Sequence, residues 1–242
     1  YIFFNLLTIN INLNLDIFDI KSYIFILSYY FHEPKLNNYI DEMIKEKNNG
    51  TIIDAGAYIG DTTLFLAKKY KNLKIYAIEP SKENINFINK VKKNNNIQNL
   101  IPLNLLLSDK NDKYITDNIN APNAIYKKTT NKNNKNNINT INSYTLDYLV
   151  DNNIINGNIS ILHYDVEGME FEVLKGSYNT IKKYKPKIIV EMLGKHNDKN
   201  IKVHKFLKDL NYTYKMIDEN CCLIDINNNK NCRNYIFTYK DY

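Results

Sequence analysis

A regular alternation of apolar, strand-like segments with helical segments begins at Thr51, and this feature most constrains the fold. The strand-like segments are TIIDA at 51–55, LKIYAIE at 73–79, NLIPLNLLL at 99–107, ISILHYD at 159–165 and PKIIVEML at 186–193. Between them, apolar residues recur at helical spacing, as at Ile85, Ile88 and Val91. Strands separated by helices imply a mostly parallel sheet covered on both faces. The sequence therefore predicts a doubly wound α/β domain with helices on both faces of the sheet.

The segments that flank this alternation complete the expected domain. Helical patterns are also present at 36–48, 144–150, 168–176, 177–184 and 203–210, and YTYKMID with NYIFTYK predicts a closing pair of strands. Residues 8–17 alternate apolar and polar side chains with period two, which predicts a half-exposed strand or an edge addition. Residues 108–143 are rich in Asn and Lys and predict a surface excursion of hairpins or mobile loop. We expect an N-terminal extension at 1–36 and one domain at 37–242.

Charge and cysteine usage set the expected partners and compartment. The chain has 32 basic and 26 acidic residues and a net charge of +6, but its lysines are spread along the sequence, so we expect no nucleic-acid partner. Cys221, Cys222 and Cys232 have no metal-ligand spacing, which favours a reducing, cytoplasmic compartment. Polar residues interrupt the apolar N-terminal segments, so we expect neither a membrane span nor a signal peptide.

The loop after the first strand of the alternation has the features of a nucleoside-binding turn. It reads DAGAYIGD at 54–61, and Gly56 and Gly60 permit close backbone approach at the start of a helix. Its glycines are spaced G-x-x-x-G, whereas a dinucleotide fingerprint is G-x-G-x-x-G. Because Asp54 precedes the first glycine, a ligand that carries an ammonium and a sulfonium suits the loop better than a pyrophosphate.

A second acidic residue follows the next strand. Glu79 ends that strand about 25 residues after Asp54, near the position where nucleotide-binding βαβ units place the acid that accepts ribose hydroxyls. Since ligands of open parallel sheets bind beyond the carboxyl ends of the strands, we expect Glu79 and the glycine loop to share one site.

Further carboxylates follow the fourth and fifth strands. The segment HYDVEGME at 163–170 places Asp165, Glu167 and Glu170 around Gly168, and Glu191 lies near the end of the fifth strand. Acids packed together beyond a buried strand destabilise one another unless they serve a partner, so we interpret them as a site that borders the nucleoside pocket.

In this order the motifs resemble the FkbM family of methyltransferases. The matching segments are TIIDAGAYIGDTTLFLA, YAIEPSKEN, NLLLSD, YTLDYL, ILHYDVEGMEFEVLKG and KIIVEML, and they cover about residues 50–195. The resemblance implies a class I, Rossmann-like methyltransferase fold with a seven-stranded sheet. It also implies S-adenosylmethionine as cofactor and transfer of its methyl group to a hydroxyl of a sugar, glycan or small metabolite.

The resemblance also implies roles for individual residues. Those implied to bind the cofactor are Asp54, Gly56, Ala57, Tyr58, Gly60, Asp61, Thr62, Glu79 and Pro80. Those implied to line the reaction side are Asp165, Glu167 and Glu191. The chain departs from the family at Tyr58, where Asn is usual, and at His163, where Lys is common. These departures put cofactor affinity and local charge in question.

Several alternatives remain open. We expect Asp165 to be the general base or the group that orients the acceptor, with Glu167 and Glu191 next, while His163 and His196 are alternative bases. The same three carboxylates have the oxygen ligands that a divalent cation prefers, but we predict no metal. The competing functions are a non-catalytic binding subunit on the same fold and an NAD-type oxidoreductase. The acceptor and the oligomeric state do not follow from the sequence.

Overall fold

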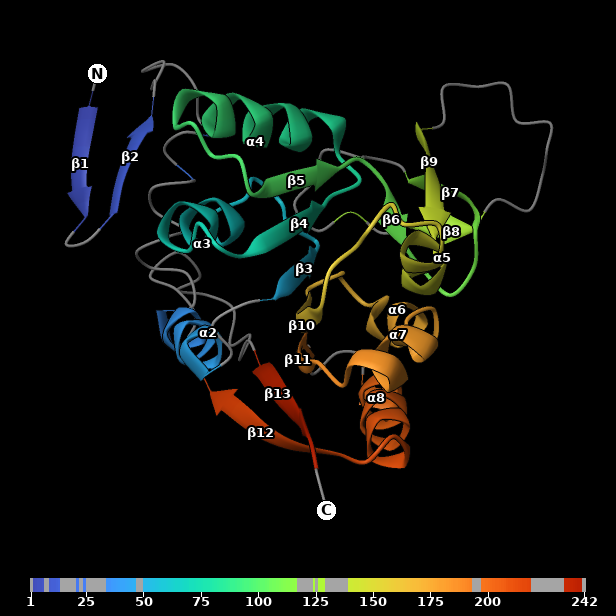
Figure 1. Cartoon of the computed structure of the whole chain (residues 1–242). Helices are drawn as coiled ribbons and strands as arrows, with labels where there is room; N and C mark the ends of the chain where they lie inside the picture. Colours follow the sequence, from blue (N-terminus) through green and yellow to red (C-terminus); the bar gives the residue numbers. More distant parts are fainter. Residues whose placement is uncertain are drawn as a thin grey trace, which may run out of the picture.

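The computed structural model describes residues 2–6, 9–13, 21, 24, 34–46, 50–116, 124, 126–128, 139–192, 197–218 and 233–240. Figure 1 shows a central sheet between two groups of helices, with a small sheet beside one end of it and a separate pair of strands near the N-terminus. No helix in the described ranges combines the length and the apolar character that crossing a membrane requires.

The central sheet has seven strands in the order β12-β13-β11-β10-β3-β4-β5. Its strands are β3 (Thr51–Ala55), β4 (Lys74–Ile78), β5 (Leu100–Leu103), β10 (Ile159–Tyr164), β11 (Lys187–Glu191), β12 (Tyr212–Asp218) and β13 (Arg233–Tyr239). Neighbouring strands from β5 to β11 pair in parallel, and β13 is antiparallel to both of its neighbours. The predicted mostly parallel, seven-stranded sheet is confirmed.

Helices cover both faces of the sheet, as predicted. One face carries α2 (Pro34–Glu46), α3 (Thr63–Lys69) and α4 (Lys82–Asn94); the other carries α5 (Leu146–Asp151), α6 (Glu170–Lys175), α7 (Tyr178–Tyr184) and α8 (Asn197–Asp209). Side chains that alternate along a strand point to opposite faces. Ile52 accordingly packs with α2, α3 and α4, whereas Ile53 packs with the second group of helices.

The elements that frame the sheet's carboxyl edge follow from local sequence. All five residues of β3 are buried, as expected for a strand with neighbours on both edges and helices on both faces. At the start of α4, the hydroxyl of Ser81 accepts a hydrogen bond from the Asn84 backbone N–H at 3.3 Å, so Ser81 is an N-cap. This cap fixes the direction in which the chain leaves β4.

The single strand predicted at 99–107 is wrong, because the chain leaves the central sheet after Leu103. The side-chain amide of Asn104 donates to the backbone carbonyls of Glu79 at 3.1 Å and Pro80 at 2.8 Å. These bonds hold Asn104 beside the end of β4, and the chain then enters a second sheet of order β6-β9-β7-β8. Its strands are β6 (Leu106–Leu107), β7 (Asp112–Thr116), β8 (Lys127–Lys128) and β9 (Asn139–Tyr144).

Two predicted segments are only partly described. Within 108–143, β7 and β8 are consecutive and antiparallel, as expected for a hairpin, whereas β9 pairs with the other edge of β7. Residues 117–123, 125 and 129–138 lie outside the described residues. Near the N-terminus, β1 (Ile2–Leu6) and β2 (Ile9–Leu13) form a separate two-stranded antiparallel sheet rather than an addition to the edge of the central one. The division into an extension at 1–36 and a domain at 37–242 stays a prediction.

Candidate functional site

A pocket of about 240 Å³ lies at the carboxyl edge of β3, β4 and β10. Its lining consists of Asp54, Ala55, Gly56, Ala57, Tyr58, Asp61, Thr62, Ile78, Glu79, Pro80, Asn84, Leu105, Leu106, Leu107, Ala124, Tyr126, His163, Asp165, Val166 and Glu167. This is the edge at which parallel α/β sheets bind ligands. All but one of the residues predicted for the cofactor line the pocket; the exception, Gly60, shapes the turn of the same loop.

The loop after β3 is held close to both neighbouring strands. Gly56 and Gly60 have φ of +87° and +79°, which favours glycine at both positions. The backbone N–H groups of Gly56 and Ala57 donate to the carbonyl of Ile78 at 3.0 and 3.1 Å. A Cβ at Gly56 would lie 1.7 Å from the backbone oxygen of Asp165, so a hydrogen atom is needed there for the loop to approach the end of β10.

Glu79 is buried at the end of β4 and accepts hydrogen bonds from three donors. Its Oε1 accepts from the Ser81 N–H at 2.8 Å and the Asn84 side-chain amide at 3.3 Å, and its Oε2 accepts from the Tyr58 N–H at 3.0 Å. Burial and, to a smaller extent, the nearby charge of Asp54 raise the pKa of Glu79 while the three donors lower it, and the net pKa is about 7. A carboxylate has about four acceptor positions and three are occupied, so Glu79 has about one position left for a ribose hydroxyl.

His163 and Asp54 form a buried pair on adjacent strands. Asp54 of β3 lies beside His163 of β10 in the parallel register, and Nδ1 of the imidazole is 2.7 Å from Oδ1 of the carboxylate. Both residues line the pocket. The histidine found where the family commonly has Lys therefore faces a carboxylate in the pocket wall.

The turn after β10 brings two of the predicted acids into the pocket. The Asp165 backbone N–H donates to the carbonyl of Ala55 at 3.0 Å, which fixes the start of the turn against β3. Asp165 Oδ1 is buried and has no hydrogen-bond partner among the described residues. Glu167 also lines the pocket, and its φ of +53° turns the backbone sharply before Gly168. Asp165 and Glu167 are therefore brought together beside the glycine loop, as expected.

Glu170, which the sequence grouped with these acids, supports the turn instead. It lies outside the pocket lining, and its Oε1 accepts from the Gly168 N–H at 2.8 Å. The Lys199 ammonium of α8 donates to the Gly168 carbonyl, so both polar groups of this peptide unit are held. Burial and, to a smaller extent, the charge of Asp165 raise the pKa of Glu170 while its backbone hydrogen bonds and Lys199 lower it, and the net pKa is about 7.

Glu191 does not join Asp165 and Glu167. It ends β11 opposite Asn234 of β13 and is not part of the described pocket lining, so its catalytic role stays a prediction. No group of three or more His, Cys, Asp or Glu side chains that could hold a metal ion occurs within the described part of the chain, and the expectation of no metal stays a prediction. His196 lies outside the described residues, as do all three cysteines.

Several pocket residues were not identified from sequence. Leu105, Leu106 and Leu107 lie within the strand predicted at 99–107, and they were missed because the observed strand β5 ends at Leu103. Ala124 and Tyr126 come from the Asn- and Lys-rich segment, in which no local pattern marks them.

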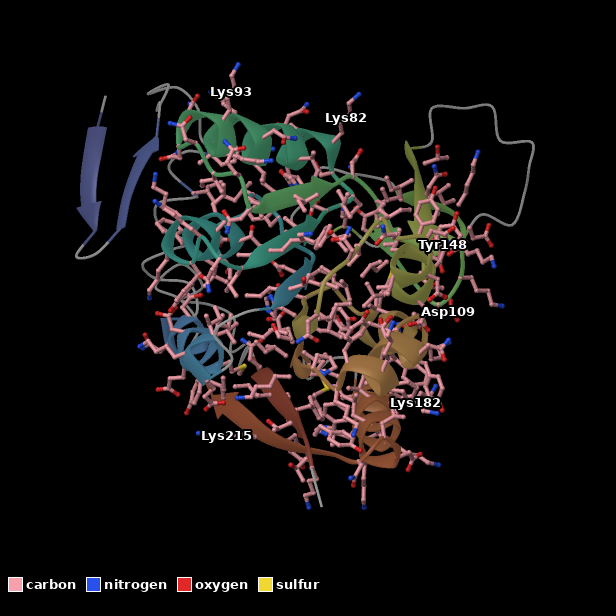
Figure 2. All side chains as sticks on the ribbon, viewed as in Figure 1. Lys82, Lys93, Asp109, Tyr148, Lys182 and Lys215 are labelled. Atoms are coloured by element: carbon pink, nitrogen blue, oxygen red, sulfur yellow. The ribbon has the colours of Figure 1, made fainter. Side chains whose placement is uncertain are left out.

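Lysines do not gather near the pocket in the described structure. None lines it, and Figure 2 shows the labelled Lys82 and Lys93 on α4, Lys182 on α7 and Lys215 on β12, at different edges of the molecule. All four are exposed.

Comparisons with known proteins agree with this architecture. The structure is similar to the FkbM methyltransferase of Methylobacillus flagellatus KT, with a TM-score of 0.54, 16% identity and 78% coverage of this chain, which spans 44% of the length of that chain. It is also similar to a precorrin-6y C5,15-methyltransferase from Geobacter metallireducens GS-15, with a TM-score of 0.51, 13% identity and coverage of 86% and 88% of the two chains. An rRNA methylase from Streptococcus thermophilus has a TM-score of 0.50, 11% identity and coverage of 83% and 93%.

These solved structures show that the fold is shared. They do not test the expectation that the chain has no nucleic-acid partner, which stays a prediction. A comparison with curated protein sequences finds no match. The model of the methyltransferase FkbM domain matches residues 54–214, which is more than half of the chain. The chain therefore belongs to the FkbM methyltransferase domain family.

Proposed function

We propose that this protein is an S-adenosylmethionine-dependent methyltransferase that acts on a hydroxyl of a sugar, glycan or small metabolite. The observation that carries the proposal is the arrangement of Glu79, the Gly56 turn and Asp165 around one pocket. Glu79 has an acceptor position left for a ribose hydroxyl, and Asp165 has a buried carboxylate oxygen without a hydrogen-bond partner among the described residues. Hydroxyl direction and the class of acceptor come from the family resemblance.

The charge of the pocket favours a cationic cofactor. Its described lining contains five carboxylic acids and no Lys or Arg; the acids are Asp54, Asp61, Glu79, Asp165 and Glu167. Opposite charges attract strongly in a partly dry site, so the ammonium and sulfonium of S-adenosylmethionine fit this lining. The residues present therefore suit the cofactor that the family implies.

The same acids disfavour a dinucleotide cofactor. In an NAD-type site, the pyrophosphate binds at the N-terminus of the helix that follows the first strand. Here Asp61 stands just before α3, and its carboxylate accepts from the Thr62 N–H at 3.2 Å. An anionic side chain thus competes for the donors that a pyrophosphate would need, which supports the methyltransferase over the oxidoreductase.

The expected reaction is an in-line displacement. When bound, S-adenosylmethionine supplies an activated methyl carbon. Its sulfur would keep the electron pair of the carbon–sulfur bond while the acceptor oxygen took the methyl group. Alignment of the reacting groups supplies about 7 to 11 kcal/mol of such barriers. Asp165 accepts the hydroxyl proton, a contribution of roughly 10² to 10⁴ in rate.

The test uses methyl-labelled S-adenosylmethionine, a panel of hydroxyl acceptors and the matched deoxy analogue of each compound that is methylated. We expect transfer only to acceptors that retain the hydroxyl. The Asp165→Asn variant is expected to bind S-adenosylhomocysteine as wild type does and to lose about 100-fold or more in turnover. Unchanged turnover would remove Asp165 from the role, and transfer to a deoxy analogue would exclude that hydroxyl as the acceptor.

A further inference from the structure

The second sheet places one aromatic side chain in the pocket. Figure 1 shows β6, β7, β8 and β9 beside the carboxyl end of β5. Tyr126 lies directly before β8, is half-buried and lines the pocket, whereas Lys127 and Lys128 are exposed. Tyr126 also packs against the apolar cluster that contains Ile78 and Leu106. Tyr126 thus contacts both the core and the pocket.

The strand that pairs with β8 is anchored to the core. Tyr114 of β7 is opposite Lys128 in the antiparallel register, and its side chain is 8% exposed. Its hydroxyl is 2.7 Å from the hydroxyl of Ser108, which is fully buried. β7 also pairs with β9 along five residue pairs. The strand that follows Tyr126, β8, is therefore part of a sheet and not of an isolated loop.

Tyr126 lies near the carboxylate that we assign to the ribose. Burial of the ring and the charge of Glu79 both raise the pKa of Tyr126 above its ordinary value, so the phenol is neutral at pH 7. The pocket lining also contains Ile78, Pro80 and Leu105 to Leu107, all apolar. A nucleoside whose ribose is bound by Glu79 has its base attached to the same sugar, and this apolar, aromatic lining suits that base.

We propose that Tyr126 is a cofactor-binding residue whose ring packs against the adenine of the nucleoside held by Glu79. This role rests on the proposed function, since it requires an adenosyl ligand in the pocket. A base stacked on an aromatic ring loses its partner when the ring is removed, which weakens binding by about 10-fold or more. The hydroxyl is not needed for such packing, so Phe preserves it.

The test is isothermal titration of the full chain with S-adenosylhomocysteine and, separately, with adenosine. The variants are Tyr126→Ala, Tyr126→Phe and the matched control Tyr148→Ala, which removes an exposed ring on α5 (Figure 2) that is not among the residues of the pocket. We expect Tyr126→Ala to weaken both ligands by about 10-fold or more, and Tyr126→Phe and Tyr148→Ala to stay within about 3-fold of wild type. Should Tyr126→Ala fail to fold, Tyr126→Leu tests the loss of the aromatic face while keeping an apolar side chain.

The outcomes separate this inference from the proposed function. If wild type binds both ligands and removal of the ring changes neither affinity, Tyr126 has no part in the site although the proposed function stands. Loss of affinity for S-adenosylhomocysteine alone would place the ring against the amino-acid part of the ligand and overturn the assignment to adenine. A folded wild type that binds neither ligand overturns the proposed function and this role with it.

Discussion

Gly56 is the point at which the cofactor loop and the reaction side of the pocket meet. Its backbone hydrogen-bonds to the end of β4, while its α-carbon packs against the carbonyl of Asp165 at the end of β10. Gly60 has a similar positive φ, but a Cβ there meets the flexible side chains of Ile88 and Leu64 at 2.9 and 3.1 Å. An added Cβ would therefore meet a backbone atom at Gly56 but only side-chain atoms at Gly60.

This difference predicts that Gly56→Ala is more destabilising than Gly60→Ala. Both changes impose left-handed backbone strain, but only the Cβ added by Gly56→Ala would overlap a backbone oxygen. We expect Gly56→Ala to lower the free energy of unfolding by about 2 to 4 kcal/mol, and by at least about 1 kcal/mol more than Gly60→Ala. Urea denaturation measures the free energy of unfolding of both variants. Equal decreases in the two variants would show that the close contact with the Asp165 carbonyl adds nothing to the cost of Gly56→Ala.

Tyr58 and His163 are the residues at which the sequence departs from the family. The Tyr58 backbone N–H binds Glu79, a bond that any residue except proline can make, although its φ of +47° lies in the left-handed region that Asn adopts more readily than Tyr. His163 binds Asp54, so a nitrogen-bearing side chain still faces that carboxylate. At both departures the residue present hydrogen-bonds to an acid of the pocket wall.

At the scale of elements, the turn between β10 and α6 positions the reaction side of the pocket. Its peptide at Gly168 is held by Glu170 on the N–H and by Lys199 on the carbonyl, and Lys199 also approaches Glu172 at 3.8 Å. A partly exposed ion pair at this distance contributes little to stability. The hydrogen bond to Gly168 is therefore the contact of Lys199 that matters for the turn.

Removal of this contact is expected to loosen the turn without unfolding the protein. In Lys199→Ala, we expect faster amide hydrogen exchange over residues 165–169, turnover reduced about 10-fold, and affinity for S-adenosylhomocysteine within about 3-fold of wild type. Lys199→Arg is expected to restore part of the turnover. The matched control is Lys202→Ala, an exposed residue of the same helix. Exchange that is identical in the two alanine variants would contradict the positioning role.

The elements also show what local sequence can and cannot predict. The predicted segments for β3, β4, β10 and β11 agree with the structure to within two residues at each end, because buried parallel strands are continuous apolar runs. The break after Leu103 was missed because Asn104 forms it through hydrogen bonds to Glu79 and Pro80, which are distant in sequence. Tyr126 was missed for the same reason: tertiary packing alone brings it to the pocket.

At the scale of the whole molecule, two buried acids make stability depend on pH. Burial raises the pKa of both Glu79 and Glu170 from 4.5 to about 7, so the folded chain holds their protons more tightly than the unfolded chain does. Their stabilising contribution is complete below about pH 4.5 and is lost as the pH rises through 7. The same burial that forms the site therefore works against stability at neutral pH.

We expect the unfolding free energy of wild type to fall relative to Glu79→Gln/Glu170→Gln as the pH rises from 5 to 8. The difference is about 2 to 3 kcal/mol for each acid, because one pKa unit corresponds to about 1.4 kcal/mol. Urea denaturation at a series of pH values measures both proteins, and the comparison cancels groups that they share. If the unfolding free energies of the two proteins change with pH in parallel, the pKa values of Glu79 and Glu170 are not raised in the folded chain.

The proposed function depends on the pocket binding an adenosyl sulfur ligand through Glu79. Isothermal titration of the purified chain with S-adenosylmethionine, S-adenosylhomocysteine and NAD, on wild type and Glu79→Ala, tests it most directly. We expect wild type to bind both sulfur ligands with dissociation constants of about micromolar order, the variant to lose that binding, and NAD not to bind. A demonstrably folded wild type that binds neither sulfur ligand would contradict the enzyme assignment and favour a non-catalytic role for the fold.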